Sequence, residues 1–249
     1  MRLLLINPNM TQSMTDTMAN IAQRTVGANV EIVAITAERG FPYIASRAEA
    51  QIAGGIVLDM IAEHGADFDA VIVAAFGDPG VAAARELFDI PIVGMAEAAV
   101  MSAALLAKTF AVVTFSSVMH RWYTDCVNAT GLSARFCGVL TPEAHSVDVS
   151  AVRHELRKEM IQLATKAVQE DSADVIIMGG APLAGLAPDI ALEVPAIVID
   201  PIAAAAAQAV ALAQITDKGA FANRASKPVA KSSVGLTPPL AAAIGKENV

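Results

Sequence analysis

Two apolar runs of strand length, each leading directly into a helix signal, constrain the fold of this chain more than any other feature. The first covers residues 70–75 and is followed by Phe76, Gly77 and Asp78; the second covers residues 175–178 and is followed by two glycines. At the first junction, Asp78 is expected to cap the next helix, because an Asp oxygen accepts hydrogen bonds from free helical N–H groups. A buried strand that enters a helix is half of a βαβ unit, and ligands of open parallel sheets bind at that junction. We therefore expect two strand-to-helix junctions that face one site.

The spacing of these junctions indicates an internal duplication. With the halves aligned at an offset of about 105 residues, Ala75 lies opposite Gly180. Residues 92–93 and 5–7 fall opposite 198–199 and 112–114 at nearly the same offset. A near-constant offset predicts two similar α/β lobes, related by a pseudo-twofold axis. The order of strand and helix patterns predicts a four-stranded parallel sheet flanked by helices in each lobe, with the active-site cleft between them.

The predicted elements follow this scheme along the chain. Strands are expected at residues 3–6, 30–35, 70–75, 90–93, 110–114, 136–140, 175–178 and 196–199. Helices are expected around Met14 to Ile21, at residues 48–63, 81–88, around Trp122, and at 152–168 and 203–215. The predicted first lobe comprises residues 1–97 plus about 203–216, and the second comprises 98–202. Residues 217–249 are expected to form an extended basic arm, with a short helix at 239–244, that wraps a neighbouring subunit or its own lobe.

Composition and charge exclude several classes of protein. The apolar share is 55% and the mean hydropathy +0.52, which two covered parallel sheets explain. No uncharged apolar stretch is long enough to span a membrane. A net charge of −8 argues against nucleic-acid binding, which depends on clustered Lys and Arg. Two cysteines give no metal-ligand spacing and no disulfide framework, so no metal site is expected and a cytoplasmic protein fits best.

Small and uncharged polar residues follow the strands that should converge on the cleft. The predicted ligand-binding residues are Asn7, Asn9, Ala75, Phe76 and Gly77 in the first lobe, and Thr114, Ser116, Gly179, Gly180, Ala181 and Pro182 in the second. Together with free N–H groups at helix N-termini, they suit a small planar or anionic ligand with carbonyl or carboxylate oxygens. The absence of a Lys/Arg cluster, of a P-loop and of a dinucleotide-binding glycine motif predicts that no cofactor is bound.

Three side chains are candidates for proton transfer. Asp78 is the only acid at a junction, so it either caps a helix or acts as a base. Ser117 and His120 lie three residues apart and share a helical face if that helix begins at residue 116. A serine nucleophile needs a base and a third orienting group, and the sequence shows no third partner. A solvated or capping His120 is therefore the alternative.

Several of these stretches together resemble the hydantoin racemase branch of the aspartate/glutamate racemase superfamily. They are residues 6–9, residues 75–87 around the first junction, and residues 93–99, and the resemblance extends over roughly residues 1–210. It implies two similar α/β lobes with the active site between them, isomerisation of a small molecule without a cofactor, and assembly into a homo-oligomer.

The resemblance also implies a departure from the family's chemistry. Racemases of this family use two cysteines, one in each lobe, to remove and return a proton on opposite faces of the substrate. Ala75 and Gly180 occupy the places of those cysteines, and neither residue can exchange a proton. Cys126 and Cys137 lie elsewhere and are expected to be buried small hydrophobes. Asp78 is then the candidate base, with Ser116, Ser117 or His120 as possible donors.

These observations predict a hydantoin racemase-like enzyme that acts on a small cyclic amide or carboxylate, such as a 5-substituted hydantoin, by a mechanism without cysteine. Two alternatives stay open. The same cleft could support hydrolysis, decarboxylation or lyase chemistry on a related small acid. It could also bind a small metabolite without catalysis.

Overall fold

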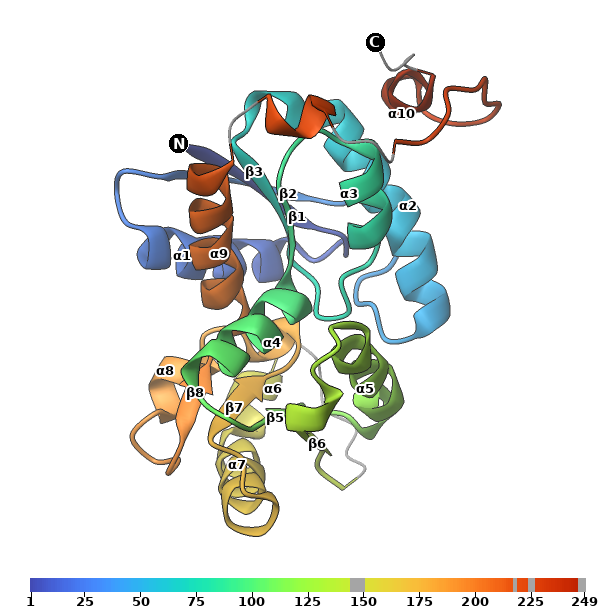
Figure 1. The fold of residues 1–249 in the computed structure, drawn as a ribbon. Coiled ribbons are helices and arrows are strands. Elements are labelled where there is room, and N and C mark those ends of the chain that lie inside the picture. The colour runs from blue at the N-terminus through green and yellow to red at the C-terminus, as the bar shows by residue number, and fades with distance from the viewer. Residues whose placement is uncertain (144–150, 217–218, 224–226, 246–249) are drawn as a thin grey trace.

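Two four-stranded, all-parallel sheets form the framework of the computed structural model, which describes residues 1–143, 151–216, 219–223 and 227–245 (Figure 1). The first sheet contains β1 (Arg2–Asn7), β2 (Glu31–Thr36), β3 (Ala70–Val73) and β4 (Ile92–Gly94), in the order β2-β1-β3-β4. The second contains β5 (Phe110–Val113), β6 (Phe136–Leu140), β7 (Val175–Met178) and β8 (Ile197–Ile199), in the order β6-β5-β7-β8. The matching strand orders confirm the predicted α/β fold of two similar lobes.

The strands form where the sequence has short, continuously apolar runs. Leu3, Leu4, Leu5 and Ile6 of β1 are fully buried, and so is every residue of β3, β5 and β7. In a parallel sheet the crossover helices cover both faces, so both sets of side chains of a central strand are buried. This burial accounts for the high mean hydropathy without a membrane segment. No helix in the described parts of the chain is long and apolar enough to cross a membrane.

The helices mostly follow the predicted pattern. They are α1 (Gln12–Val26), α2 (Arg47–His64), α3 (Val81–Leu87), α4 (Met95–Leu106), α5 (His120–Ala129), α6 (Val152–Glu155), α7 (Arg157–Asp171), α8 (Leu186–Ile190), α9 (Pro201–Ile215) and α10 (Pro238–Ile244). The expectation of one long helix over 152–168 was wrong, because the helix is interrupted at Leu156, where φ is −98° and ψ is 5°. Helices α4 and α8 were not predicted.

One continuous core crosses the boundary between the lobes. It contains Leu5 and Ile72 of the first sheet together with Phe110 and Val112 of the second. Helix α4, which leads from β4 to β5, contacts α9 and reaches β7 of the second sheet. Helix α9 comes from the C-terminal third of the chain but packs against α1, α4 and β3 of the first lobe (Figure 1). The lobes are therefore packed together as well as tethered.

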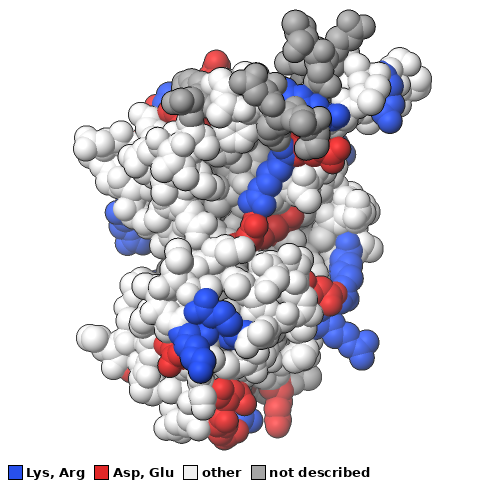
Figure 2. Space-filling model, viewed as in Figure 1, with Lys and Arg blue, Asp and Glu red and all other residues white. Residues whose placement is uncertain are grey.

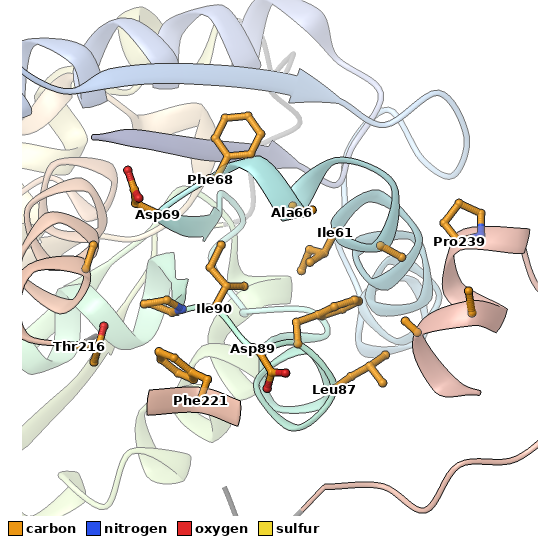
Figure 3. A pocket seen from close by; sticks show the side chains of 17 residues that line it. Ile61, Ala66, Phe68, Asp69, Leu87, Asp89, Ile90, Thr216, Phe221 and Pro239 are labelled. Carbon is orange, nitrogen blue, oxygen red and sulfur yellow. The ribbon is translucent and has the colours of Figure 1, made fainter. Parts of the chain in front are cut away.

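The described part of the C-terminal arm lies on its own first lobe. Helix α10 packs against α2, and the Thr237 hydroxyl donates a 2.7 Å hydrogen bond to Asp59. The arm also borders a pocket of about 550 Å³ at the amino ends of β3 and β4, where Phe68, Phe221 and Pro239 are among the lining residues (Figure 3). This is the edge of the sheet opposite to the one where ligands are expected. Of the arm's basic residues, Lys218, Arg224 and Lys246 lie outside the described residues.

Candidate active site

Residues that follow β1, β3 and β7 meet between the lobes around a small cavity. Its volume is about 20 Å³, and it is lined by Asn9, Tyr43, Ile44, Ala75, Phe76, Trp122, Tyr123 and Ala181. The expected residues Asn9, Ala75, Phe76 and Ala181 are thus brought together from the two halves of the chain. A cavity of this size holds about one water molecule. The structure therefore shows the cleft in a closed arrangement.

Aromatic side chains close the cleft. Phe76 of the first lobe packs on Tyr123 of α5, with 4.6 Å between the ring centroids. Tyr43, from the loop between β2 and α2, packs on Phe115 at 5.9 Å. Both pairs join the two lobes, and such tilted aromatic pairs contribute about 0.5–1.5 kcal/mol beyond the area that they bury. The sequence did not indicate Tyr43, Trp122 or Tyr123 as site residues.

Trp122 separates this cavity from a larger groove. The groove has a volume of about 780 Å³ and lies between α2, α5 and the turn before α3, with Gly77, Asp78, Trp122 and Cys126 among its lining residues. Trp122 lines both spaces, and its indole lies on Gly77. Gly77 has a φ of +140°, and a Cβ there would lie 2.8 Å from Trp122 Cε2. Glycine is therefore required for the indole to seal the cavity.

Asn7 and Asn9 have different roles at the end of β1. Asn7 is fully buried, and its amide nitrogen donates to Asn9 Oδ1 (3.0 Å) and Thr15 Oγ1 (2.9 Å). Its own oxygen accepts from the backbone N–H of Asn9 at 3.1 Å. Asn7 therefore fixes the turn that presents Asn9, and it is Asn9 that lines the cavity. The Asn9 amide nitrogen has only the weakly accepting sulfur of Met14, at 3.7 Å, as a partner among the described residues.

Asp78 does not cap the helix that follows it, and that expectation was wrong. The residue before α3 is Gly80, with a φ of +77°, whereas the Asp78 carboxylate accepts from the backbone N–H groups of Ala96 (2.8 Å) and Glu97 (2.7 Å) at the start of α4. The carboxyl group reaches α4 because β3 and β4 are neighbours and Gly94 leaves room for it. Burial raises the pKa of Asp78 to about 7, while the two N–H donors oppose that shift.

Three hydroxyl groups gather beside the cavity. Tyr123 is buried, and its pKa lies well above the usual value because of that burial. The hydroxyls of Tyr43 and Thr114 lie close enough to influence it, yet both are buried and make no hydrogen bond of normal geometry within the described residues. Thr114, a predicted ligand-binding residue, is fully buried behind the cavity. At neutral pH all three groups are neutral and able to donate.

The remaining predicted residues lie around this centre or away from it. Ser117 lies in the 3₁₀ turn Ser117–Met119 and His120 begins α5, so the helix does not start at residue 116. Both are exposed, Ser116 is half-buried, and none of the three lines the cavity. Gly179 uses its N–H in a 2.8 Å hydrogen bond to the Val113 carbonyl. Pro182 lies in the short 3₁₀ turn Ala181–Leu183 that follows Gly180.

The cysteines and the acidic groups give no further catalytic cluster in the described structure. Cys126 borders the groove, and burial raises the pKa of its thiol to about 12. Cys137 lies half-buried in β6, and burial raises the pKa of its thiol too. Within the described ranges, no three His, Cys, Asp or Glu side chains are grouped closely enough to hold a metal ion.

Comparison with known proteins agrees with this geometry. The family model of the Asp/Glu/Hydantoin racemase family matches residues 3–209. The chain belongs to this racemase family. It is 33% identical to the hydantoin racemase of Paenarthrobacter aurescens over 233 residues, which are 93% of this chain and 99% of that protein. Allantoin racemase structures from Pseudomonas fluorescens and Klebsiella pneumoniae superpose with TM-scores of 0.85 and 0.84, both at 28% identity, and cover 94% and 96% of this chain and 100% and 98% of their own.

In this hydantoin racemase-like member of the family, position 75 lines the interlobe cavity and position 180 adjoins Tyr123, another residue of its lining. Ala75 lines the cavity directly. Gly180 has a φ of +118°, and a Cβ there would lie 3.3 Å from both the Tyr123 hydroxyl oxygen and Phe115 Cε1. Such contacts are tighter than normal van der Waals packing, so a larger side chain at position 180 would displace its aromatic neighbours. The absence of a side chain at position 180 and the position of Tyr123 are therefore structurally linked.

Proposed function

We propose that this protein binds a small, uncharged cyclic amide, such as a 5-substituted hydantoin, between its lobes and exchanges the proton on the ring carbon next to a carbonyl. The observation that carries the proposal is the lining of the interlobe cavity. It combines residues from the two strand-to-helix junctions with hydrogen-bond donors and contains no Lys, Arg, Asp or Glu. A charged amino acid would lose its hydration there without a counter-charge, which is costly.

The donors favour the enolate form of such a ligand. The Asn9 amide and the hydroxyls of Tyr43 and Tyr123 lie at the cavity wall. The backbone N–H groups of Gly77 and Gly180 have no acceptor within the described residues. Donors fixed around a water-poor site stabilise an oxygen that gains negative charge as the neighbouring C–H bond breaks, without having to reorganise.

Substrate entry requires the closed arrangement to open. A five-membered ring is several times larger than a water molecule, so a cavity of about 20 Å³ cannot admit it unless Trp122 or the lobes move. The 780 Å³ groove provides the approach, because Trp122 is the wall that it shares with the cavity. Closure over the bound ring then excludes water, as in many enzymes with mobile loops or domains.

Asp78 is the candidate base within this proposal. It borders the groove on the other side of Trp122 from the cavity, so it reaches the ring only when Trp122 moves. A pKa near 7 suits a group that gains and loses a proton at neutral pH. Both of its oxygens are held by α4 in the closed arrangement, so release from these hydrogen bonds must accompany proton transfer. We expect Asp78→Asn to lose proton exchange, whereas Asp125→Asn, which changes another acid of the same groove, keeps it. Equal exchange by wild type and Asp78→Asn would exclude this assignment.

The proposal is tested by proton NMR of the purified protein with L- and D-5-substituted hydantoins and with allantoin in D₂O. Loss of the C5 proton signal faster than in a protein-free control supports the proposal. New product signals would show a changed reaction, such as hydrolysis or decarboxylation. Saturable binding without either effect, followed through the fluorescence of the single tryptophan, would favour the non-catalytic binding protein.

A further inference from the structure

The Tyr123 hydroxyl lies directly beside the position that the Cβ of a side chain at residue 180 would take. A Cβ on Gly180 would be 3.3 Å from that oxygen. The Tyr123 ring packs on the rings of Phe76 and Trp122, with ring centroids 4.6 and 5.7 Å away, and these contacts fix its position. Helix α5 holds the ring at this place, since Trp122, Tyr123 and Val127 are its buried residues. The position of the hydroxyl thus depends on packing from both lobes.

Two further hydroxyls lie beside it. Tyr43 Oη and Thr114 Oγ1 are buried and within reach of the Tyr123 hydroxyl, but neither forms a hydrogen bond of normal geometry with a described residue. Leaving a buried polar group unsatisfied is costly, so native structures satisfy nearly all of them, and exceptions call for an explanation. Tyr43 and Tyr123 both line the cavity, and Thr114 adjoins Tyr123 from the end of β5.

We propose that Tyr123, Tyr43 and Thr114 form a hydroxyl cluster that binds a carbonyl oxygen of the cyclic amide, with the Tyr123 hydroxyl held close beside Gly180. This inference rests on the proposed function and adds the residues that recognise the ligand on the side of the second lobe. Because burial raises the pKa of Tyr123, its phenol stays protonated and acts as a hydrogen-bond donor at neutral pH. A neutral donor cluster selects a carbonyl or enolate oxygen and offers no counter-ion to a free carboxylate.

Removing the Tyr123 hydroxyl tests the cluster. Tyr123→Phe retains the ring that packs on Phe76. Thr124→Val on the same helix is the matched control, because the Thr124 hydroxyl donates to the His120 carbonyl of its own helix and Thr124 does not line the cavity. The probes are hydantoin and succinimide, which carry ring carbonyls, and proline, which is a charged ring of similar size. Binding is measured by titrating Trp122 fluorescence, and proton exchange is measured separately by NMR in D₂O.

We expect Tyr123→Phe to bind hydantoin and succinimide about 10–100-fold more weakly than wild type, as for loss of one buried hydrogen bond. Thr124→Val is expected to bind both cyclic amides as wild type does. Proline is expected to bind neither to wild type nor to Tyr123→Phe, and the melting temperature of Tyr123→Phe should stay close to that of wild type. Unchanged hydantoin binding by Tyr123→Phe would overturn the inference, and so would a wild-type protein that binds no cyclic amide. Binding that depends on Tyr123 without proton exchange would refute the proposed function alone.

A second pair of variants tests the spatial link with position 180. Gly180→Ala places a methyl group against the Tyr123 hydroxyl at a φ of +118°, so it should lower the melting temperature. In the Tyr123→Phe background the same change should lower it less, because the hydroxyl has vacated that space. Gly131→Ala, at a φ of +76° with no atom within 4 Å of its Cβ, controls for backbone strain. Additive effects of Gly180→Ala and Tyr123→Phe would show that the two positions do not share this space.

Discussion

The contact between Gly77 and Trp122 gives a prediction whose magnitude follows from the structure. In Gly77→Ala, the new Cβ would overlap Trp122 Cζ2 and would lie 2.8 and 2.9 Å from Cε2 and Cη2 of the same ring. Carbon atoms pack at about 3.5–4.0 Å, so the indole has to move by more than about 1 Å. Overpacking of this kind costs about 1–3 kcal/mol, and a non-glycine residue at a φ of +140° costs a further ~1–3 kcal/mol. We expect the free energy of unfolding to fall by about 4 kcal/mol.

The assay uses the single tryptophan of the chain as its own reporter. Urea unfolding gives the free energy, while a red shift of the native emission reports displacement of the buried Trp122. Gly27→Ala is the matched control, because Gly27 has a φ of +74° and no atom within 4 Å of its Cβ. It should cost only about 1–2 kcal/mol for the left-handed backbone and leave the emission unchanged. If Gly77→Ala is no less stable than Gly27→Ala, or if its emission does not shift, the indole does not seal the cavity as described.

Three further changes address the acidic groups. The pKa of Asp78 rises to about 7 on folding, so the folded state binds a proton more strongly and the free energy of unfolding should fall as pH increases from about 4 to 7. Asp78→Asn should remove this part of the pH dependence, measured by urea unfolding at pH 5 and 7.5. The same pH dependence in wild type and Asp78→Asn would contradict the prediction. The buried Asp200 accepts hydrogen bonds from the N–H groups of Gly185 and Ile202, so Asp200→Ala should lower the free energy of unfolding by about 2–4 kcal/mol. Asp16 is exposed, so Asp16→Ala should lower it by less than about 0.5 kcal/mol in the same denaturation assay. Arg47 of α2 forms an ion pair with Asp125 of α5, but both side chains are exposed. Arg47→Ala should therefore change the free energy of unfolding by less than about 1 kcal/mol. A larger loss would show that this pair holds the lobes together.

The fold could be predicted from sequence because its signals are local. Each central strand is a short apolar run bounded by turn residues, and the repeat of that pattern revealed the two lobes. Helix α4 escaped prediction because it is apolar on all sides, with Gly94 rather than a polar side chain at its N-cap, so neither periodicity nor capping marks it. The break at Leu156 also has no proline or glycine signal in the sequence.

The candidate site could be predicted only in part. The strand ends supplied Asn9, Ala75, Phe76 and Ala181, because parallel topology fixes where strand ends lie. Tyr43 comes from a loop, and its position depends on packing between lobes, which short sequence patterns do not encode. Asp78 shows the same limit, because a local capping rule assigns it to the next helix, whereas the neighbouring strand brings α4 within reach of its carboxylate.

The position of α9 has a consequence for how the chain folds as it is made. The first four strands are complete at Gly94, but α9, which covers this sheet, ends only at Ile215. At a synthesis rate of about 5–20 residues per second, the first lobe waits roughly 6–24 seconds for its last layer. The second lobe, whose strands and crossover helices are then all in place, can finish first. During translation, the half of the protein that emerges first from the ribosome is thus the half that matures last, and its uncovered apolar face needs protection for that interval.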